Sequence, residues 1–325
     1  MDYNPYGFCF AFKEFDGGPT NTAEQKDAQE FLNLLFDRLE TALKPTSRKY
    51  LLQDIFGGKQ CSQMVCTECG KVKNRHEDFY NLSLNIKDIK SIYESLAKLV
   101  EGEIISDYQC DGCNRKVDLS KRTLIAETPN VLIVHLQRIG FNFETFETDK
   151  VNTLCKFPSV LDLKPYSYFE VMGKEKRLLT QQEEESSNKP KEDEDVLTEE
   201  EIAKRKEDEE EKREPVREDC FEYKLVGVNV HSGTANMGHY WSYINTNRGT
   251  DEKDGDTNWT RTEADPWMEF NDSRVSDFSF KELEKHCFGN EAGSGFMGDS
   301  YGTSGYMLFY ERRVKKDLKF LILDE

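Results

Sequence analysis

Long apolar runs are what this chain most clearly lacks. No stretch approaches the ~20 consecutive apolar residues that a membrane-spanning helix needs, and the first residues lack the basic-then-apolar pattern of a secretory signal. Hydrophobic residues make up 37% of the 325 residues and charged residues 33%. This balance predicts a soluble globular body with solvated insertions.

Positive charge is also in short supply. The chain has 44 lysines and arginines against 62 aspartates and glutamates, which gives a formal net charge of −18. Nucleic acids and anionic membranes would both be repelled by such a surface. We therefore expect no nucleic-acid and no membrane partner, and a basic polypeptide partner is favoured.

Cysteine is too scarce for a disulfide scaffold, with nine residues in the whole chain. Four of them form two Cys-x-x-Cys pairs, Cys66 with Cys69 and Cys110 with Cys113. Such pairs indicate a metal site in a reducing compartment, so cytoplasm or nucleus is expected. The alternatives are two unrelated turns with free thiols, or a redox pair. Flanking strand patterns favour one structural zinc ion held by all four thiolates, which leaves no open position for catalysis.

A hairpin pattern near the middle of the chain carries two histidines. Alternating apolar residues over 225–230 and 240–244 flank a connection rich in glycine and polar residues, which predicts two paired strands. His231 and His239 stand at its inner shoulders, and Asn271 and Asp272 follow a later apolar run. A histidine with an orienting amide or carboxylate is two thirds of a nucleophilic triad. The competing interpretation is a structural histidine, which we favour for His231 and for His135 in the apolar strand pattern 131–138.

Several motifs resemble those of the ubiquitin-specific proteases, papain-like cysteine proteases that cut ubiquitin from its conjugates. The matching segments are VHSG at 230–233, GHY at 238–240, FNDS at 270–273, YMLFYE at 306–311 and, less closely, QKDAQEF at 25–31. Within the family, the likeness is to the very large members of the fat-facets class. The resemblance implies an α+β, papain-like fold with thumb, zinc-ribbon fingers and palm, and it implies ubiquitin and ubiquitinated proteins as partners.

The resemblance also implies roles for single residues. His239 would be the catalytic base, Asn271 its orienting residue and Asp272 an assisting neighbour. Asp27, Tyr240 and Trp241 would bind the extended ubiquitin tail. The four cysteines would form the tip of the fingers, which grip the ubiquitin body.

The predicted organisation is an incomplete domain. It comprises a thumb remnant (1–48), zinc-ribbon fingers (62–118) and a palm in two parts (119–173 and 220–313), with an acidic insertion at 174–219. A core helix is expected from Gln25 to Leu43, capped by Thr22, with Ala28, Phe31, Leu35, Leu39 and Ala42 on its apolar face, widened by Leu32 and Leu43. The insertion holds nineteen acidic and eleven basic residues, a net of −8, and its poverty in apolar residues predicts that it does not join a core.

The nucleophile of the resembling family has no counterpart here. In that family it lies in a Gly-x-x-Asn-x-Gly-Asn-Thr-Cys-Tyr-x-Asn box before the QKDAQEF segment, and nothing in the sequence matches it. Cys9 has the wrong neighbours and stands too close to Gln25; no motif surrounds Cys61, Cys155, Cys220 or Cys287. Two hypotheses follow: a deubiquitinase domain whose nucleophilic cysteine lies outside this chain, or an inactive, ubiquitin-binding pseudo-protease module. The intact His239 and Asn271 motifs favour the first, although this chain alone is expected to be inactive.

Overall fold

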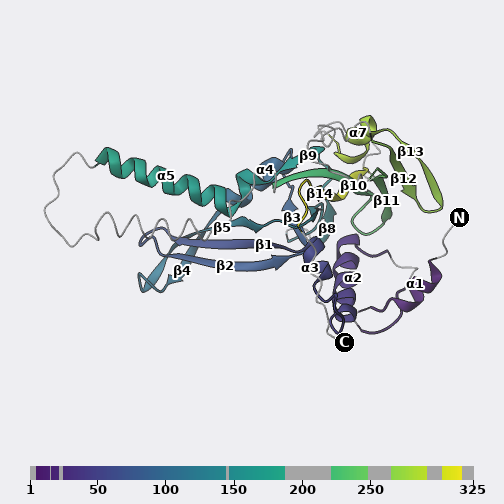
Figure 1. Ribbon diagram of the computed structural model, residues 1–325, viewed down its shortest axis with the longest axis horizontal. Helices are drawn as coiled ribbons and strands as arrows, with labels where there is room; N and C mark the ends of the chain where they lie inside the picture. Colours follow the sequence, from purple (N-terminus) through teal and green to yellow (C-terminus); the bar gives the residue numbers. More distant parts are fainter. Residues whose placement is uncertain are drawn as a thin grey trace.

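A computed structural model describes residues 5–14, 16–21, 25–143, 146–186, 221–247, 265–290 and 302–316. These residues form a mixed α+β structure with two main sheets and one hairpin (Figure 1). None of the described helices combines the length and apolarity that crossing a bilayer would need. Thr22, expected to cap the first long helix, lies outside the described residues.

A four-stranded antiparallel sheet projects from one end of the molecule and forms the fingers (Figure 1). Its order is β2-β1-β5-β4, with bounds β1 Gly58–Cys66, β2 Val72–Phe79, β4 Glu103–Cys110 and β5 Arg115–Glu127. The turns that join β1 to β2 and β4 to β5 each contain one of the Cys-x-x-Cys pairs. The expected finger segment, 62–118, also contains β3 and α4, which pack with the palm.

The palm is the larger sheet, described with eight strands. Its order is β13-β12-β11-β10-β14-β6-β3, with β9 added beside β10. The bounds are β3 Asn81–Asn85, β6 Val131–Gln137, β9 Val160–Asp162, β10 Glu222–Gly233, β11 Gly238–Asn245, β12 Trp267–Asn271, β13 Arg274–Phe278 and β14 Ser304–Arg312. The expected histidine hairpin is confirmed as β10 and β11, and β6 lies inside the sheet as its apolar run predicts.

Short helices and one hairpin complete the palm. They are α4 Ile92–Glu101, η1 Lys164–Tyr166, η4 Phe280–Glu282, α7 Leu283–Cys287 and the hairpin of β7 Ile139–Asn142 with β8 Glu147–Lys150. The main core lies between the palm sheet and these helices, and includes Leu96, Ile125, Leu225, Trp267 and Leu308. Burying side chains of this size supplies most of the free energy that holds such a sheet together.

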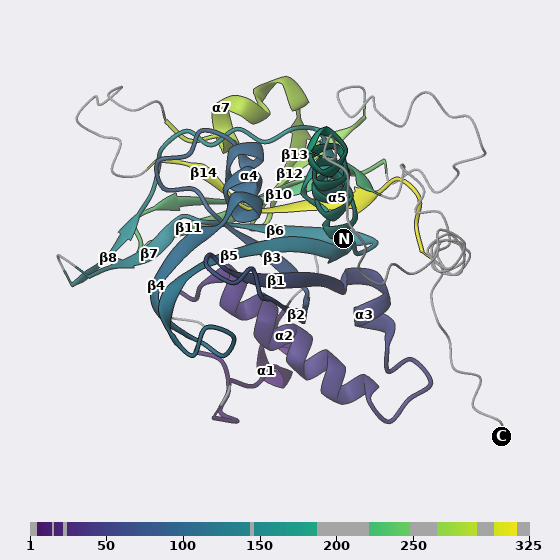
Figure 2. The same ribbon diagram turned by 90° about the vertical axis from the view of Figure 1, so that its left-hand side faces the viewer.

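The segment expected as the thumb remnant contains α1 Tyr6–Ala11, α2 Ala28–Leu43 and α3 Leu51–Phe56. These helices lie below the palm strands in both views (Figures 1 and 2). The helix expected from Gln25 begins three residues later, because the carboxylate of Asp27 caps it by accepting from the backbone N–H groups of Gln29 and Glu30.

The expected apolar face of α2 is only partly right. The buried residues of the helix are Leu34 and Phe36, and Leu32 and Leu43 pack against the core cluster of Phe36, Leu52 and Ile133. Phe31 and Leu39, which were expected to point into the core, are 39% and 38% exposed. The helix therefore turns part of its apolar surface outward.

A long helix, α5 Tyr168–Ser186, runs along the fingers on the side away from α2 (Figures 1 and 2). Val171 packs against Cys61 and Leu124 of the finger sheet. Arg122 donates to Gln63 and to both carboxylate oxygens of Glu175, at 2.6 and 2.9 Å. The expected start of the acidic insertion at Lys174 is therefore too early, because residues up to Ser186 are helical; the rest, 187–219, lies outside the described residues.

Candidate functional site

The turn between β10 and β11 places His239 one residue after the turn ends. Its two ends, Gly233 and Gly238, are paired with each other. Gly233 has a φ of +117°, and a Cβ on Gly238 would lie 2.2 Å from the carbonyl oxygen of Ser232. Only glycine fits both positions, because a side chain would strain the first and clash at the second. The turn is thus tight, and the start of β11 is defined by its backbone.

His239 and Asn271 form the central contact of the site. Nε2 of His239 lies 2.7 Å from Oδ1 of Asn271, the last residue of β12. Nδ2 of Asn271 donates to Glu269 at 3.2 Å, which turns the amide oxygen toward the ring. An amide oxygen can only accept, so Nε2 carries the hydrogen and Nδ1 keeps its lone pair in the neutral ring. The arrangement prepares Nδ1 to take a proton.

The surroundings of His239 leave it open to reactants. Its side chain is 46% exposed, and its ring stacks on Trp241 with the centroids 5.7 Å apart. Asp272 lies further away than Asn271, with Oδ2 3.7 Å from Nε2, and its side chain is 79% exposed. The structure thus brings together four of the residues that the sequence singled out, His239, Trp241, Asn271 and Asp272, with Asn271 as the direct hydrogen-bond partner of His239.

Asp27 and Tyr240 line a cavity of about 260 Å³ beside the histidine hairpin. Asp27 is held on both oxygens: Oδ1 accepts from the start of α2, and Oδ2 accepts from the hydroxyl of Tyr306 in β14. Burial raises the pKa of Tyr306 and of Tyr240, so both phenols stay protonated. Asp27 therefore joins the thumb helix to the palm at the edge of this cavity.

Two further histidines close the inner wall of the same cavity. His135 is buried in β6 with Nδ1 3.1 Å from the hydroxyl of Ser83, and burial lowers its pKa. His231 is 1% exposed and packs on Tyr240; burial, followed by the nearby Lys150, lowers its pKa to about 4. Both are buried neutral residues, in keeping with the structural roles expected for them.

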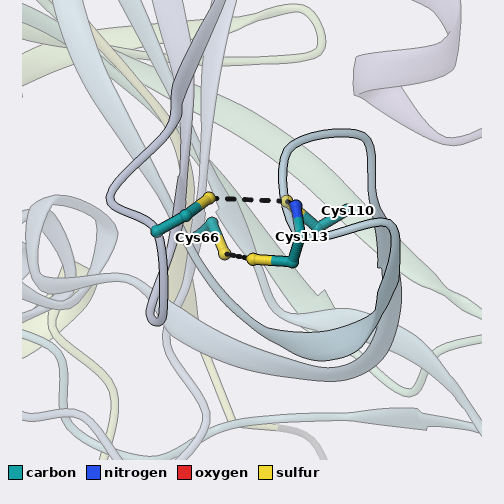
Figure 3. Close-up of side chains that lie close together, drawn as sticks. Cys66, Cys110 and Cys113 are labelled. Carbon is teal, nitrogen blue, oxygen red and sulfur yellow. Dashed lines mark hydrogen bonds between the residues drawn. The ribbon is translucent and has the colours of Figure 1, made fainter.

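The four cysteines of the two pairs meet at the tip of the fingers (Figure 3). The sulfur atoms of Cys66 and Cys113 are 3.7 Å apart, as are those of Cys69 and Cys110, and all four lie within 4.8 Å of one another. Four thiolates at the usual Zn–S distance around one tetrahedral ion would be about 3.8 Å apart. The donor set and spacing therefore fit a four-thiolate metal site.

The electrostatics of the cluster already favour thiolate formation at one ligand. Backbone N–H groups of Cys69 and Glu68 lower the pKa of Cys66 to about 6. At Cys110, the N–H groups of Gly112 and Cys113 approach the sulfur to 3.4 and 3.5 Å. Such N–H···S contacts stabilise the deprotonated sulfur that a metal ion requires.

Comparison with known proteins identifies the family. The model of the ubiquitin carboxyl-terminal hydrolase family matches residues 5–310. The chain belongs to this family. It is 36% identical over 330 residues to ubiquitin carboxyl-terminal hydrolase puf of Drosophila melanogaster, covering 98% of the chain but 8% of that protein. It is 33% identical to human ubiquitin carboxyl-terminal hydrolase 34 (95% and 8%) and 32% identical to mouse ubiquitin carboxyl-terminal hydrolase 9Y (95% and 12%).

Membership of the ubiquitin carboxyl-terminal hydrolase family confirms the resemblance and the papain-like α+β fold. The chain spans about a tenth of the length of these relatives. The roles expected for single residues stay predictions; these residues are Asp27, His239, Tyr240, Trp241, Asn271 and Asp272.

A hydrolase of this family needs a nucleophile, and the described cysteines are placed elsewhere. Cys61 and the four-cysteine cluster belong to the fingers, while Cys155 and Cys287 are buried in the palm core. Cys9 lies on α1, and Cys220 lies outside the described residues. Within the described part of the chain, no thiol is hydrogen-bonded to His239.

Sequence reasoning missed three residues that shape the site. Gln25 accepts from the N–H of Gly238 at 2.6 Å, Tyr306 donates to Asp27, and Lys150 contacts the end of β10. Gln25 and Tyr306 stood inside segments quoted for the family resemblance, but only as parts of a motif. No local pattern signals these contacts, because each joins residues far apart in the chain.

Proposed function

We propose that this chain is the larger part of a thiol-dependent deubiquitinase domain whose nucleophilic cysteine lies on a segment outside it. One observation carries the proposal: a half-exposed imidazole whose Nε2 donates to an amide oxygen at 2.7 Å, leaving Nδ1 free to act as a base. Papain-like cysteine proteases use the same pairing of histidine with an orienting amide. Family membership supplies ubiquitin conjugates as the substrate class.

The proposed reaction follows from the geometry. Nδ1 of His239 takes the proton of the incoming cysteine, and the thiolate attacks the carbonyl carbon of the C-terminal glycine of ubiquitin. The imidazolium then returns the proton to the leaving amine, and a water molecule, deprotonated by the same nitrogen, hydrolyses the thioester. Asn271 keeps the ring oriented throughout, while Asp272 assists through charge alone.

Substrate binding is assigned to the cavity beside the hairpin. Asp27 and Tyr240 line this cavity, and Trp241 stacks on His239; all three would contact the ubiquitin tail. The carboxylate of Asp27 already accepts three hydrogen bonds within the chain, which fix its position and its negative charge at the edge of the cavity. The outward apolar surface of α2, with Phe31 and Leu39 exposed, supports a further covering segment on this side.

The proposal is tested by adding a segment that carries the nucleophilic cysteine. Co-expression of this chain with a segment carrying an Asn-Thr-Cys box should give labelling by a ubiquitin-tail electrophile and cleavage of a ubiquitin–fluorophore substrate. The bare chain should do neither, and His239→Ala in the reconstituted pair should abolish turnover. Labelling of the bare chain that Cys9→Ser abolishes would contradict the proposal.

The alternative function is a ubiquitin-binding pseudo-protease, and it is favoured by the finding that none of the described thiols is hydrogen-bonded to His239. Two observations distinguish the enzyme from the pseudo-protease: the sequence of the parent transcript and a measurement of ubiquitin binding. A pseudo-protease would bind ubiquitin without any in-frame cysteine box upstream, and addition of the box would not restore turnover.

We also propose that the finger cysteines hold a structural zinc ion. The 3.7 Å sulfur separations and the four-sulfur donor set support zinc in particular, since a tetrahedral set of four thiolates is its usual structural site. When bound, the ion would cross-link the β1–β2 and β4–β5 turns, and Cys66, Cys69, Cys110 and Cys113 would be its ligands.

A further inference from the structure

A lysine behind the histidine hairpin makes an unusual set of contacts. Lys150, the last residue of β8, directs its ammonium at three backbone carbonyl groups. Nζ donates to His231 at 3.0 Å, to Gly233 at 3.3 Å and to Gly302 at 2.9 Å. In the described part of the chain, no carboxylate lies within ion-pair distance of this ammonium. All three protons are thus used on the backbone.

The three carbonyl groups belong to strand ends that must meet for the site to form. His231 and Gly233 end β10, and Gly302 precedes β14, whose Ser304 pairs with His231. Gly233 pairs with Gly238, and Ser232 pairs with His239. The ammonium therefore holds the β10 side of the turn, through the two residues that flank Ser232, the pairing partner of His239 on β11.

A second contact holds the same turn from the thumb side. The side chain of Gln25 accepts the N–H of Gly238, and the turn closes on itself through Thr234 N–H to the carbonyl of Met237 at 2.7 Å. The backbone of residues 231–238 is thus anchored from β8 on one side and from Gln25, in the segment before α2, on the other. His239 follows at once, with no intervening residue to absorb a shift.

The backbone that carries Lys150 is itself held in place by hydrogen bonds. Lys150 pairs with Ile139, and the neighbouring Arg138 is fully buried and donates to four carbonyl groups, those of Gly305, Val151, Thr153 and Phe288. Burial, with the nearby charge of Arg138, lowers the pKa of Lys150 to about 8. A partly buried cation without a counter-charge is costly, and among the described residues this ammonium is balanced by three carbonyl groups, at the end of β10 and just before β14.

We propose that Lys150 is a positioning residue for His239: its ammonium gathers the ends of β10 and β14 and so sets where β11 begins and how His239 meets Asn271. The inference rests on the proposed function in taking His239 as the base, but its geometry does not depend on ubiquitin or on the missing cysteine. Without Nζ, three carbonyl dipoles would converge on one another with no donor, and the turn would relax outward.

The test measures the imidazole itself. In the chain as it stands, labelled with ¹⁵N-histidine, His239 should give the signature of the tautomer with hydrogen on Nε2. Lys150→Met keeps the length of the side chain and removes all three donors, and it should give a mixture of tautomers at His239. Backbone exchange at Gly238 and His239 should speed up by about tenfold or more, since their hydrogen bonds would open locally. The five histidines are assigned by single His→Gln variants.

Two further variants separate positioning from general stability. Lys224, at the other end of β10, is partly buried and paired with Asp265, so Lys224→Met should lower the melting temperature without changing the His239 tautomer. Lys150→Gln keeps a shorter, neutral donor and should give a tautomer ratio between those of the unmodified chain and Lys150→Met. This variant also keeps the test valid if Lys150→Met does not fold. An unchanged His239 signal in a folded Lys150 variant, or equal changes in the Lys150 and Lys224 variants, would overturn the proposal. A reconstituted pair made with the unmodified chain that shows no deubiquitinase activity, although His239 carries its hydrogen on Nε2, would instead count against the proposed function.

Discussion

Asn271 and Asp272 are adjacent in sequence, but the structure gives them unequal shares in orienting His239. Oδ1 of Asn271 accepts from the ring at 2.7 Å, whereas the exposed carboxylate of Asp272 stays 3.7 Å away. Asn271→Ala should therefore lower kcat of the reconstituted enzyme on the order of 10²-fold or more, because the ring loses its tautomer and orientation. Asp272→Ala should cost less than about tenfold. Ubiquitin–fluorophore turnover measures both, and equal losses would contradict the assignment.

His231 predicts how stability depends on pH. Its pKa is lowered to about 4 by burial, then by Lys150 and His239, while the nearby Asp27 raises it. The unfolded chain, with a histidine pKa near 6.5, binds more protons between pH 6.5 and 4, so stability falls as the pH drops through this window. The loss should reach about 2 kcal/mol at pH 5.

Urea unfolding at pH 7 and pH 5 measures this loss in the unmodified chain and in His231→Gln. The difference between the two proteins isolates the histidine from the carboxylates, which titrate in both. A variant that loses as much stability as the unmodified chain between these pH values would refute the assignment.

At the residue scale, the sequence predicted those site residues that stand in short local motifs. His239 and Asn271 were found because each stands in a short recognisable segment. Lys150, Gln25 and Tyr306 were not, since their contacts span 152, 213 and 279 residues respectively, and only the folded backbone brings them together. Positioning residues are thus harder to predict than the groups they position.

At the scale of elements, the finger tip should depend on its metal. The β1–β2 and β4–β5 turns are each short and hold little buried apolar surface beyond Cys66, Cys110 and Val117. Structural zinc is worth about 10–16 kcal/mol of apparent binding free energy in small sites. A chelator should therefore release about one zinc per chain and speed up hydrogen exchange around residues 66–72 and 108–116, with the palm unchanged.

Elemental analysis and hydrogen exchange of single Cys→Ser variants test which cysteines bind the metal. Cys69→Ser should lose the metal, whereas Cys9→Ser, on α1, should retain it. Purified protein without zinc, and with all four finger thiols freely titratable, would contradict the proposal.

The helix α2 shows where periodicity stops being informative. Its apolar residues surround more than half of the helix, so the sequence predicts a core helix but not which stripe faces the palm. Asp27 sets the start of the helix by capping it, and the buried residues are Leu34 and Phe36, of which Phe36 shares a core cluster with Ile133 of the palm. The histidine hairpin was easier, because strict alternation assigns each residue of a strand to one face.

At the scale of the whole molecule, the acidic segment should be dispensable, but only in part. Replacing residues 187–219 with a Gly-Ser linker of about 16 residues, long enough to run back along α5, should change the melting temperature little, because the segment has too few apolar residues to join a core. Extending the deletion to Lys174 removes Glu175 and its contacts with Arg122, and should cost stability. Calorimetry of the two deletions checks the boundary; equal losses would show that residues 187–219 pack against the rest.

The order of strands in the palm has a consequence for synthesis of the chain. Strand β6 lies between β3, which is made earlier, and β14, whose first residue Ser304 comes 167 residues after Gln137. At 5–20 residues per second, a ribosome needs roughly 8–33 seconds to make that stretch. Throughout this time β6 presents an unpaired edge, along with the buried residues Leu132, Ile133 and Val134, to the cell. The nascent chain should therefore be a client of ribosome-associated chaperones until its last strand emerges.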